Sequence, residues 1–203
     1  MQRSLVGSEM CIRDRPCGQS SVKYEKQKDD GRMETQKRKQ NEKEKAERRM
    51  KIVAGFGSVD EYIPYVLAGA DELFCGYVPY NWTKKYGTVL PLNRREVLAY
   101  NVQLGSFSEL EILSAMIRKY RKPVHIAMNS LYYIPEQYEE IADIVKQCMK
   151  IGFDSFILAD PALILYLRQK GISCKIHLSG EAGEMNREAI KVFQEMWVDR
   201  IIF

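Results

Sequence analysis

The chain has 203 residues, of which 45% are hydrophobic and 10% aromatic, a composition typical of a globular rather than a disordered protein. Its formal net charge of +4 arises from residues 1–50, which hold 14 Lys and Arg against 9 Asp and Glu, whereas the remainder holds 17 against 18. The basic balance therefore does not indicate a nucleic-acid-binding surface in the rest of the chain.

Cysteine usage and hydropathy indicate the cellular setting. The five cysteines are scattered, form no Cys-x-x-Cys pair and lack the spacing of a metal site, which favours a reduced, cytoplasmic protein with no metal ligand set. No apolar run reaches the roughly 18 residues that a membrane span needs. We therefore expect no membrane partner, and the oligomeric state is left open.

The amino-terminal quarter differs from the rest. Residues 1–15 resemble the translation of a sequencing adapter and are set aside from the fold. Residues 16–49 are rich in Lys, Glu and Gln and have few large apolar side chains, which predicts a disordered, charged leader. The folded domain is expected over residues 50–203, with Met50 as the true start and Met33 as the alternative.

From residue 50 onward, short apolar runs alternate with amphipathic segments. Ser58 and Glu61 have the spacing of a helix capping box, and so do Ser106 and Glu109. A connection rich in Tyr, Pro and Asn spans residues 76–105, and loops of that length usually carry function or small elements of their own. Strands are expected at residues 51–54, 73–75, 124–128, 155–159, 175–178 and 199–203, with helices that begin near residues 58, 106, 135, 161 and 184.

The order of these elements predicts the fold class. One αβ corner occurs three times, at residues 69–71, 152–154 and 197–199, and the alternation of strands with helices predicts a parallel sheet. Six strands and five helices fall short of the eight βα units of a TIM barrel. The expected fold is therefore α/β, a parallel (β/α) TIM-barrel-like domain that is incomplete at its carboxyl end. A doubly wound open sheet is the alternative, supported only by the weak Gly55-Phe56-Gly57 turn.

Polar residues follow several expected strands at the carboxyl end, where parallel α/β folds bind ligands. Asn129 follows the third strand and Asp160 the fourth. Either could contact a substrate, although Asp160 directly before a proline is also a typical helix cap. Arg94 and Arg95 lie in the long connection and suit an anionic ligand if they face the same opening, or form a solvated helix start.

The fifth strand carries the candidate catalytic residues. His177 and Ser179 are two residues apart and so share one face of the strand, which makes them a candidate base and nucleophile, and Glu181 follows in the turn. The structural alternatives stay open: a buried histidine that donates to a carbonyl, a capping serine and a solvated glutamate. Aromatic residues expected at the same opening, which could stack a substrate or pack the long loop, are Tyr77, Tyr80, Trp82, Tyr86, Tyr132 and Tyr133.

Residues 51–203 resemble the U32 peptidase family, the collagenase-like proteins of unassigned catalytic type. The best-matched motif is Ile176-His177-Leu178-Ser179, with Asn186 at the family's spacing. The chain departs from the family at Ser179-Gly180-Glu181, where members often have Ser-Thr-Gln. Further matches in family order lie at residues 53–58, 68–73, 93–95, 107–110, 127–129 and 152–161.

The resemblance implies a barrel-like domain and one of several functions. The first is hydrolysis of peptide bonds in a peptide or protein substrate. The second is an accessory role in the hydroxylation of RNA or a quinone, with an iron–sulfur cluster whose cysteines would lie beyond Phe203; the cofactor is otherwise unassigned. The third is a non-catalytic binding domain. The candidate catalytic residues are Ser179, His177 and Glu181, and the candidate substrate-binding residues are Asn129, Asp160, Asn186, Arg94 and Arg95.

An unclosed barrel leaves strand edges unpaired. We therefore expect the chain by itself to be inactive and poorly soluble.

Overall fold

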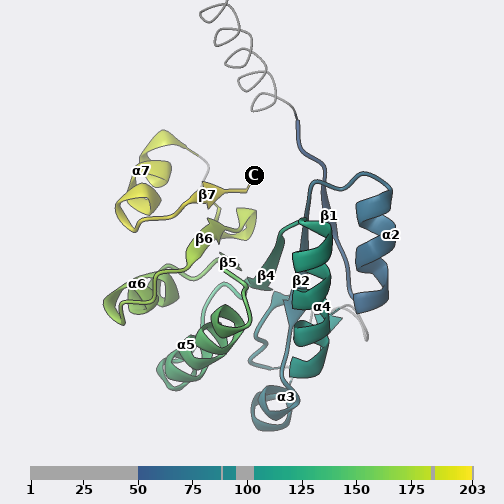
Figure 1. Cartoon of the computed structure of the whole chain (residues 1–203). Coiled ribbons are helices and arrows are strands. Elements are labelled where there is room, and N and C mark those ends of the chain that lie inside the picture. Colours follow the sequence, from purple (N-terminus) through teal and green to yellow (C-terminus); the bar gives the residue numbers. More distant parts are fainter. Residues whose placement is uncertain (1–49, 88, 95–102, 184–185, 203) are drawn as a thin grey trace, which may run out of the picture. The chain divides into compact units, whose positions relative to one another are not determined.

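The computed structural model describes residues 50–87, 89–94, 103–183 and 186–202, so the expectations for residues 1–49 lie outside the described part. The described elements belong to one compact unit that begins at Lys51. Parallel strands form a single curved sheet (Figure 1). The strands are β1 (Val53–Gly55), β2 (Glu72–Tyr77), β3 (Gln103–Leu104), β4 (Val124–Met128), β5 (Ser155–Leu158), β6 (Lys175–Leu178) and β7 (Arg200–Ile201).

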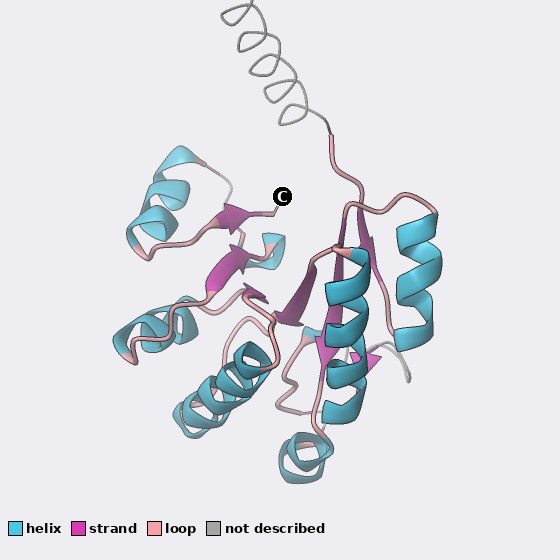
Figure 2. Ribbon diagram, viewed as in Figure 1, coloured by secondary structure: helices cyan, strands magenta, loops and turns pink. Residues whose placement is uncertain are grey.

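Helices alternate with these strands and lie around the outer face of the sheet (Figure 2). Two expected boundaries have clear local causes: Pro135 and Pro161 each occupy the first position of a helix, where the missing N–H costs nothing. The helical elements are η1 (Val59–Glu61), α2 (Tyr62–Leu67), α3 (Tyr80–Tyr86), α4 (Phe107–Tyr120), α5 (Pro135–Lys150), α6 (Pro161–Gln169), η3 (Gly180–Ala182) and α7 (Arg187–Glu195).

The strand order confirms the half-barrel. Strands pair in the order β1-β2-β4-β5-β6-β7, always in parallel, while β3 pairs with the end of β2. Because successive strands are added on one side, the order does not reverse as it would in a doubly wound sheet. Among the described residues β1 and β7 pair with one neighbour each, so the barrel is incomplete.

Side chains alternate between two environments along each strand. On the outer face, residues such as Leu73, Ile126 and Phe156 are fully buried beneath the helices and form the hydrophobic core. The inner face instead carries polar side chains at intervals, among them His125 and His177. The alternation therefore separates a structural face from a face that can bind ligands.

The long connection contains two elements that the sequence pattern did not specify. Helix α3 follows β2 directly, and its Trp82 is fully buried, with the indole N–H donating to the Leu90 carbonyl at 3.2 Å. Strand β3 adds two residues to the sheet. The expected strand at residues 73–75 is also longer than predicted, because it begins at Glu72 and continues to Tyr77.

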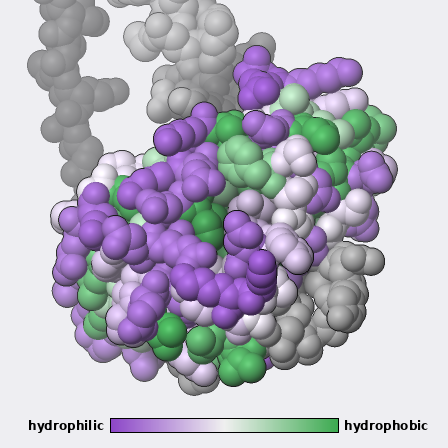
Figure 3. Space-filling view, turned by 90° about the horizontal axis from the view of Figure 1, so that it is seen from below, coloured by the Kyte–Doolittle hydropathy of each residue, from purple (hydrophilic) through white to green (hydrophobic). Residues whose placement is uncertain are grey.

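The surface of the unit is polar on the side shown in Figure 3, where apolar residues form small separate groups among hydrophilic ones. Within the described ranges, none of the helices has the length and apolar character needed to cross a bilayer.

Candidate functional site

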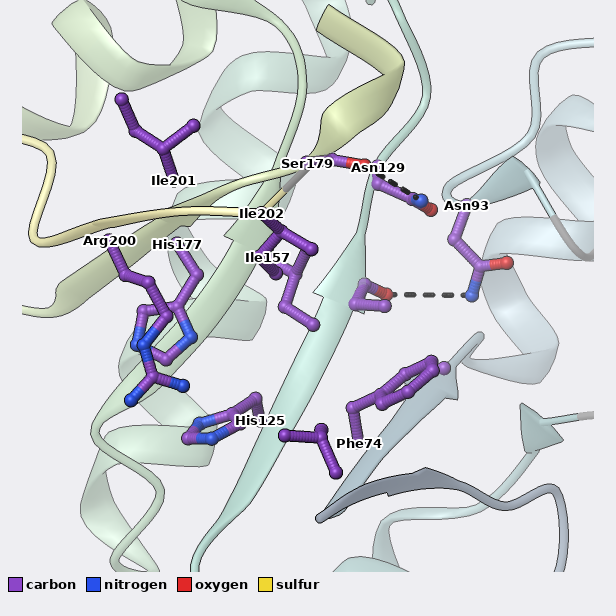
Figure 4. Close-up of a pocket in the computed structure, with 13 residues that line it drawn as sticks. Phe74, Asn93, His125, Asn129, Ile157, His177, Ser179, Arg200, Ile201 and Ile202 are labelled. Carbon is purple, nitrogen blue, oxygen red and sulfur yellow. Dashed lines mark hydrogen bonds between the residues drawn. The ribbon is translucent and has the colours of Figure 1, made fainter. Parts of the chain in front are cut away.

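A cavity of about 450 Å³ lies on the inner face of the half-barrel (Figure 4). Residues from β1, β2, β4, β5, β6 and β7 all line it, so it occupies the position of a barrel interior. Its apolar lining consists of Val53, Phe74, Ala127, Ile157, Ile201 and Ile202. Its polar lining consists of Asn93, His125, Asn129, His177, Ser179 and Arg200.

The carboxyl ends of the strands lie at one end of the cavity, which we call the mouth. It consists of Asn129 after β4, Ser179 and Glu181 after β6, and Asn93 and Arg94 from the long connection. The Asn129 amide donates to Ser179 Oγ at 3.5 Å, and the Arg94 backbone N–H donates to Asn129 Oδ1 at 3.3 Å. The Arg94 guanidinium pairs with the Glu181 carboxylate. Four residues predicted from the sequence are thus brought together, although their segments lie up to 87 positions apart.

Ser179 is held by amide groups. It caps η3 by accepting from the Glu181 backbone N–H at 3.4 Å, and it also accepts from the Asn129 amide. It is 6% exposed. Both hydrogen bonds use Ser179 as the acceptor, and no group among the described residues accepts from its O–H, which could therefore donate to a ligand.

His177 lies on the inner face, and no hydrogen bond joins it to Ser179 in the described part of the chain. Its Nδ1 is buried and has no hydrogen-bond partner among the described residues, so the expected donation to a carbonyl is not made there. Burial, with the nearby His125 and Arg200, lowers the pKa of His177 to about 4. The imidazole is therefore neutral at pH 7.

Two other predicted substrate-binding residues cap helices. The buried Asp160 accepts from the Ala162 N–H at 2.8 Å at the start of α6, and also from the Tyr133 N–H at 3.1 Å. Asn186 accepts from two backbone N–H groups at the start of α7, each at 3.0 Å. Neither lines the cavity. Arg95 lies outside the described residues.

A second polar group lies below the mouth, towards the amino ends of the strands (Figure 4). We call Glu72, His125, His177 and Arg200 the floor cluster. Arg200 donates to the Glu72 carboxylate through Nη1 at 2.5 Å and Nη2 at 3.2 Å, and Lys51 approaches the same carboxylate at 2.7 Å. Hydrogen bonds from Arg200, followed by those from Lys51 and His125, hold the pKa of Glu72 well below its usual range.

The ionised Glu72 fixes the proton position on His125. A carboxylate only accepts hydrogen bonds, so His125 Nε2, at 3.1 Å from Glu72, carries the proton. Nδ1 then accepts from the Ser155 hydroxyl at 2.6 Å. Burial lowers the pKa of His125, which keeps the ring neutral. The His125 and His177 rings are in contact, with centroids 4.4 Å apart.

Sequence reasoning missed Glu72, Arg200 and Asn93. Glu72 and Arg200 directly follow the αβ corners at residues 69–71 and 197–199, and the corner motif indicates a turn rather than a functional residue. The alternation of side chains between the two faces of a strand could have indicated both residues. Glu72 precedes the inward-facing Phe74 by two positions, and Arg200 lies opposite His177 in the sheet register.

Most of the aromatic residues expected at the opening pack in or against the hydrophobic core. Tyr77, Trp82 and Tyr133 are buried, so they pack the long connection. Tyr80 and Tyr132 are the exposed ones, at 75% and 70%.

The part of the chain that the structure describes contains no group of three or more His, Cys, Asp or Glu side chains that could hold a metal ion. Its cysteines are buried and lie apart along the chain, Cys75 in β2, Cys148 in α5 and Cys174 directly before β6. Burial raises the pKa of Cys148 to about 12, so this thiol stays protonated.

The fold and the cavity place the chain among parallel half-barrel proteins, and a family model identifies it further. The model of Peptidase family U32 matches residues 57–203, and the chain belongs to this family. A solved structure of the U32 peptidase Mk0906 has a TM-score of 0.52 at 15% identity, covering 75% of this chain and 57% of that one, which supports the shared fold.

A curated relative is tRNA hydroxylation protein P of Escherichia coli (strain K12), which is 27% identical over 134 residues. The match covers 66% of this chain and 26% of the relative. The chain therefore spans about a quarter of that protein's length.

Proposed function

We propose that this chain provides a substrate-binding half-barrel for RNA hydroxylation within the U32 family. The observation that carries the proposal is the environment of Ser179. Its hydroxyl contacts the Asn129 amide and a backbone N–H, whereas a serine nucleophile needs a base within hydrogen-bond reach. An amide and a hydroxyl at the mouth of a largely apolar cavity suit recognition of a polar ring by hydrogen bonding.

The choice of RNA over a quinone rests on the similarity to tRNA hydroxylation protein P. The mouth suits a nucleobase because it offers hydrogen-bond donors and an acceptor side by side. The donors are the Ser179 O–H and the side-chain amide N–H of Asn129 that does not bond to Ser179, and the acceptor is the side-chain amide oxygen of Asn129. These groups can pair with the edge of a base that has left its stack.

The test is a chimera in which residues 57–202 replace the matching region of tRNA hydroxylation protein P. In cells that lack the native protein, mass spectrometry of tRNA nucleosides measures hydroxylation. We expect the chimera to restore it and Asn129→Ala to reduce it at least about tenfold. Lys146→Ala, which removes an exposed ion pair with Asp143 on α5, is the matched control and should retain activity. A well-folded chimera that leaves tRNA unmodified would contradict the proposal.

Peptide-bond hydrolysis is the second candidate. It is favoured by His177 in β6 and Ser179, which directly follows the strand, because both line the same cavity. It would require the His177 ring to reach the Ser179 hydroxyl when a peptide is bound. Cleavage of a casein or collagen-peptide substrate by the purified chain, lost in Ser179→Ala and kept in Ser108→Ala, would support this candidate over RNA hydroxylation.

A further inference from the structure

The floor of the cavity differs in charge from its mouth. Among the described residues that line the cavity, Arg200 is the charged one, and no carboxylate lines it. Glu72 lies behind Arg200 and is itself contacted by Arg200, Lys51 and His125. With both histidines neutral, the single Glu72 carboxylate is contacted by two cations, Arg200 and Lys51, of which Arg200 lines the cavity.

Arg200 is held in place by Glu72 but does not use all of its hydrogen-bond donors there. A guanidinium has five N–H donors, and the two hydrogen bonds to Glu72 leave three without an acceptor among the described residues. The arginine side chain is 41% exposed, whereas that of Glu72 is 5% exposed. Glu72 therefore orients the guanidinium, and Arg200, with donors that Glu72 does not use, lines the cavity.

The rest of the floor is suited to an apolar group. Phe74 and Ile157 line the cavity beside the His125 and His177 rings (Figure 4). His177 Nδ1 adds a buried polar atom that has no hydrogen-bond partner among the described residues, and leaving such an atom unpaired is unfavourable. The Arg200 donors and the apolar side chains of Phe74 and Ile157 together suit a ligand that has an acidic group attached to an apolar body.

We propose that the floor cluster binds the carboxylate of a small organic acid through Arg200, with the apolar body of the acid against Phe74 and Ile157. Such a ligand would occupy the cavity beneath the mouth and leave Asn129 and Ser179 free for the substrate. The proposal does not depend on RNA hydroxylation, because the floor lies apart from the mouth and the test contains no RNA.

The test compares benzoate with benzyl alcohol, which share a ring but differ in charge. Binding to the full chain is measured by saturation-transfer NMR. We expect benzoate to bind at least about tenfold more tightly, and Arg200→Gln to remove this preference while benzyl alcohol still binds. Arg187→Gln, on the exposed first position of α7, is the matched control and should keep the preference.

A second measurement uses the unaltered chain and so does not depend on whether the variant folds. The sequence contains two histidines, both in the floor cluster, so their ring protons can be followed directly. A bound carboxylate stabilises the imidazolium form and should raise the pKa of His177, whereas benzyl alcohol should leave it unchanged. Equal affinity for the two probes, together with no difference in the histidine titration, would overturn the proposal.

Discussion

Arg200 on β7 donates two hydrogen bonds to Glu72 on β2, across the inner face and 128 residues away along the chain. Three strands, β4, β5 and β6, separate these two in the sheet. Lys51, two residues before the edge strand β1, contacts the same carboxylate at 2.7 Å. One buried carboxylate thus connects both edges of the half-barrel and favours its curved form.

Removing the arginine should destabilise the fold. Arg200→Gln leaves the buried Glu72 with Lys51 and His125 alone, so we expect the free energy of unfolding to fall by about 2 kcal/mol, as measured in urea. Lys175→Gln is the control, because its ion pair with Asp154 is exposed on both sides and should contribute about 0.5 kcal/mol or less. Equal losses in the two variants would mean that the inner pair has no structural role.

Stability should depend on pH through His177. Its pKa is about 4 in the folded chain and near 6.5 when unfolded, so the unfolded state binds more protons between these values. The contribution is therefore complete above about pH 6.5 and is lost as the pH falls towards 4, with a slope of up to about 1.4 kcal/mol per pH unit. Urea titrations at several pH values should show this slope, and His177→Gln should reduce it to the part that comes from His125, whose pKa burial also lowers. An unchanged slope in the variant would assign the effect to other groups.

Glu72 adds a separate, more acidic dependence. Its pKa is lowered on folding, so its contribution is present above the unfolded value near 4.3 and is lost as the pH falls further. Glu72→Gln should remove this portion, below the pH range in which His177 acts.

The two helix caps should differ in strength. Asp160→Ala removes the cap of α6 together with the hydrogen bond to the buried Tyr133 N–H, so the expected loss is about 2 kcal/mol. Asn186→Ala removes an exposed cap of α7 and should cost about 1 kcal/mol or less. Thermal unfolding of both variants measures the difference. A larger loss for Asn186 would show that the buried Tyr133 contact contributes little.

Gly76 is required by close packing beneath the mouth. A Cβ at this position would lie 2.2 Å from Asn93 Nδ2 and 2.7 Å from Gln103 Oε1, and Asn93 is 1% exposed. Gly76→Ala should therefore displace Asn93 and cost about 1–3 kcal/mol. Gly105→Ala is the control, because a Cβ there meets nothing within 4 Å. Chemical denaturation compares the two, and a neutral Gly76→Ala would mean that the Asn93 side chain moves freely.

The regular part of the fold could be predicted because local and tertiary preferences agree. Strands β4 and β6 and the starts of α5 and α6 lie where apolar runs and prolines indicated. Helix α3 and strand β3 were not specified, because their register depends on tertiary contacts such as the Trp82 bond to Leu90 and the pairing of Gln103 with Gly76. A two-residue strand has too little periodicity of its own to indicate its position.

The sequence pointed to Asn129, Ser179 and Glu181 at the mouth and to His177 at the floor, but not to Glu72 and Arg200. Asn129, Ser179 and Glu181 follow strand ends, a position that the parallel topology assigns to one edge of the sheet. Asp160 follows a strand in the same way, yet its side chain turns to the helix start, which the sequence had left as an alternative. Glu72 and Arg200 required knowledge of which face of each strand points inward, and that depends on how the whole sheet curves.

The distance along the chain between Glu72 and Arg200 has a consequence for biosynthesis. A chain emerging from the ribosome presents Glu72 early, when Lys51 is its available partner, and His125 and Arg200 follow only as β4 and β7 are made. The last of these contacts requires all the intervening strands to be in register. A nascent chain that has not yet reached Arg200 would therefore present a Glu72 carboxylate that lacks its strongest partner.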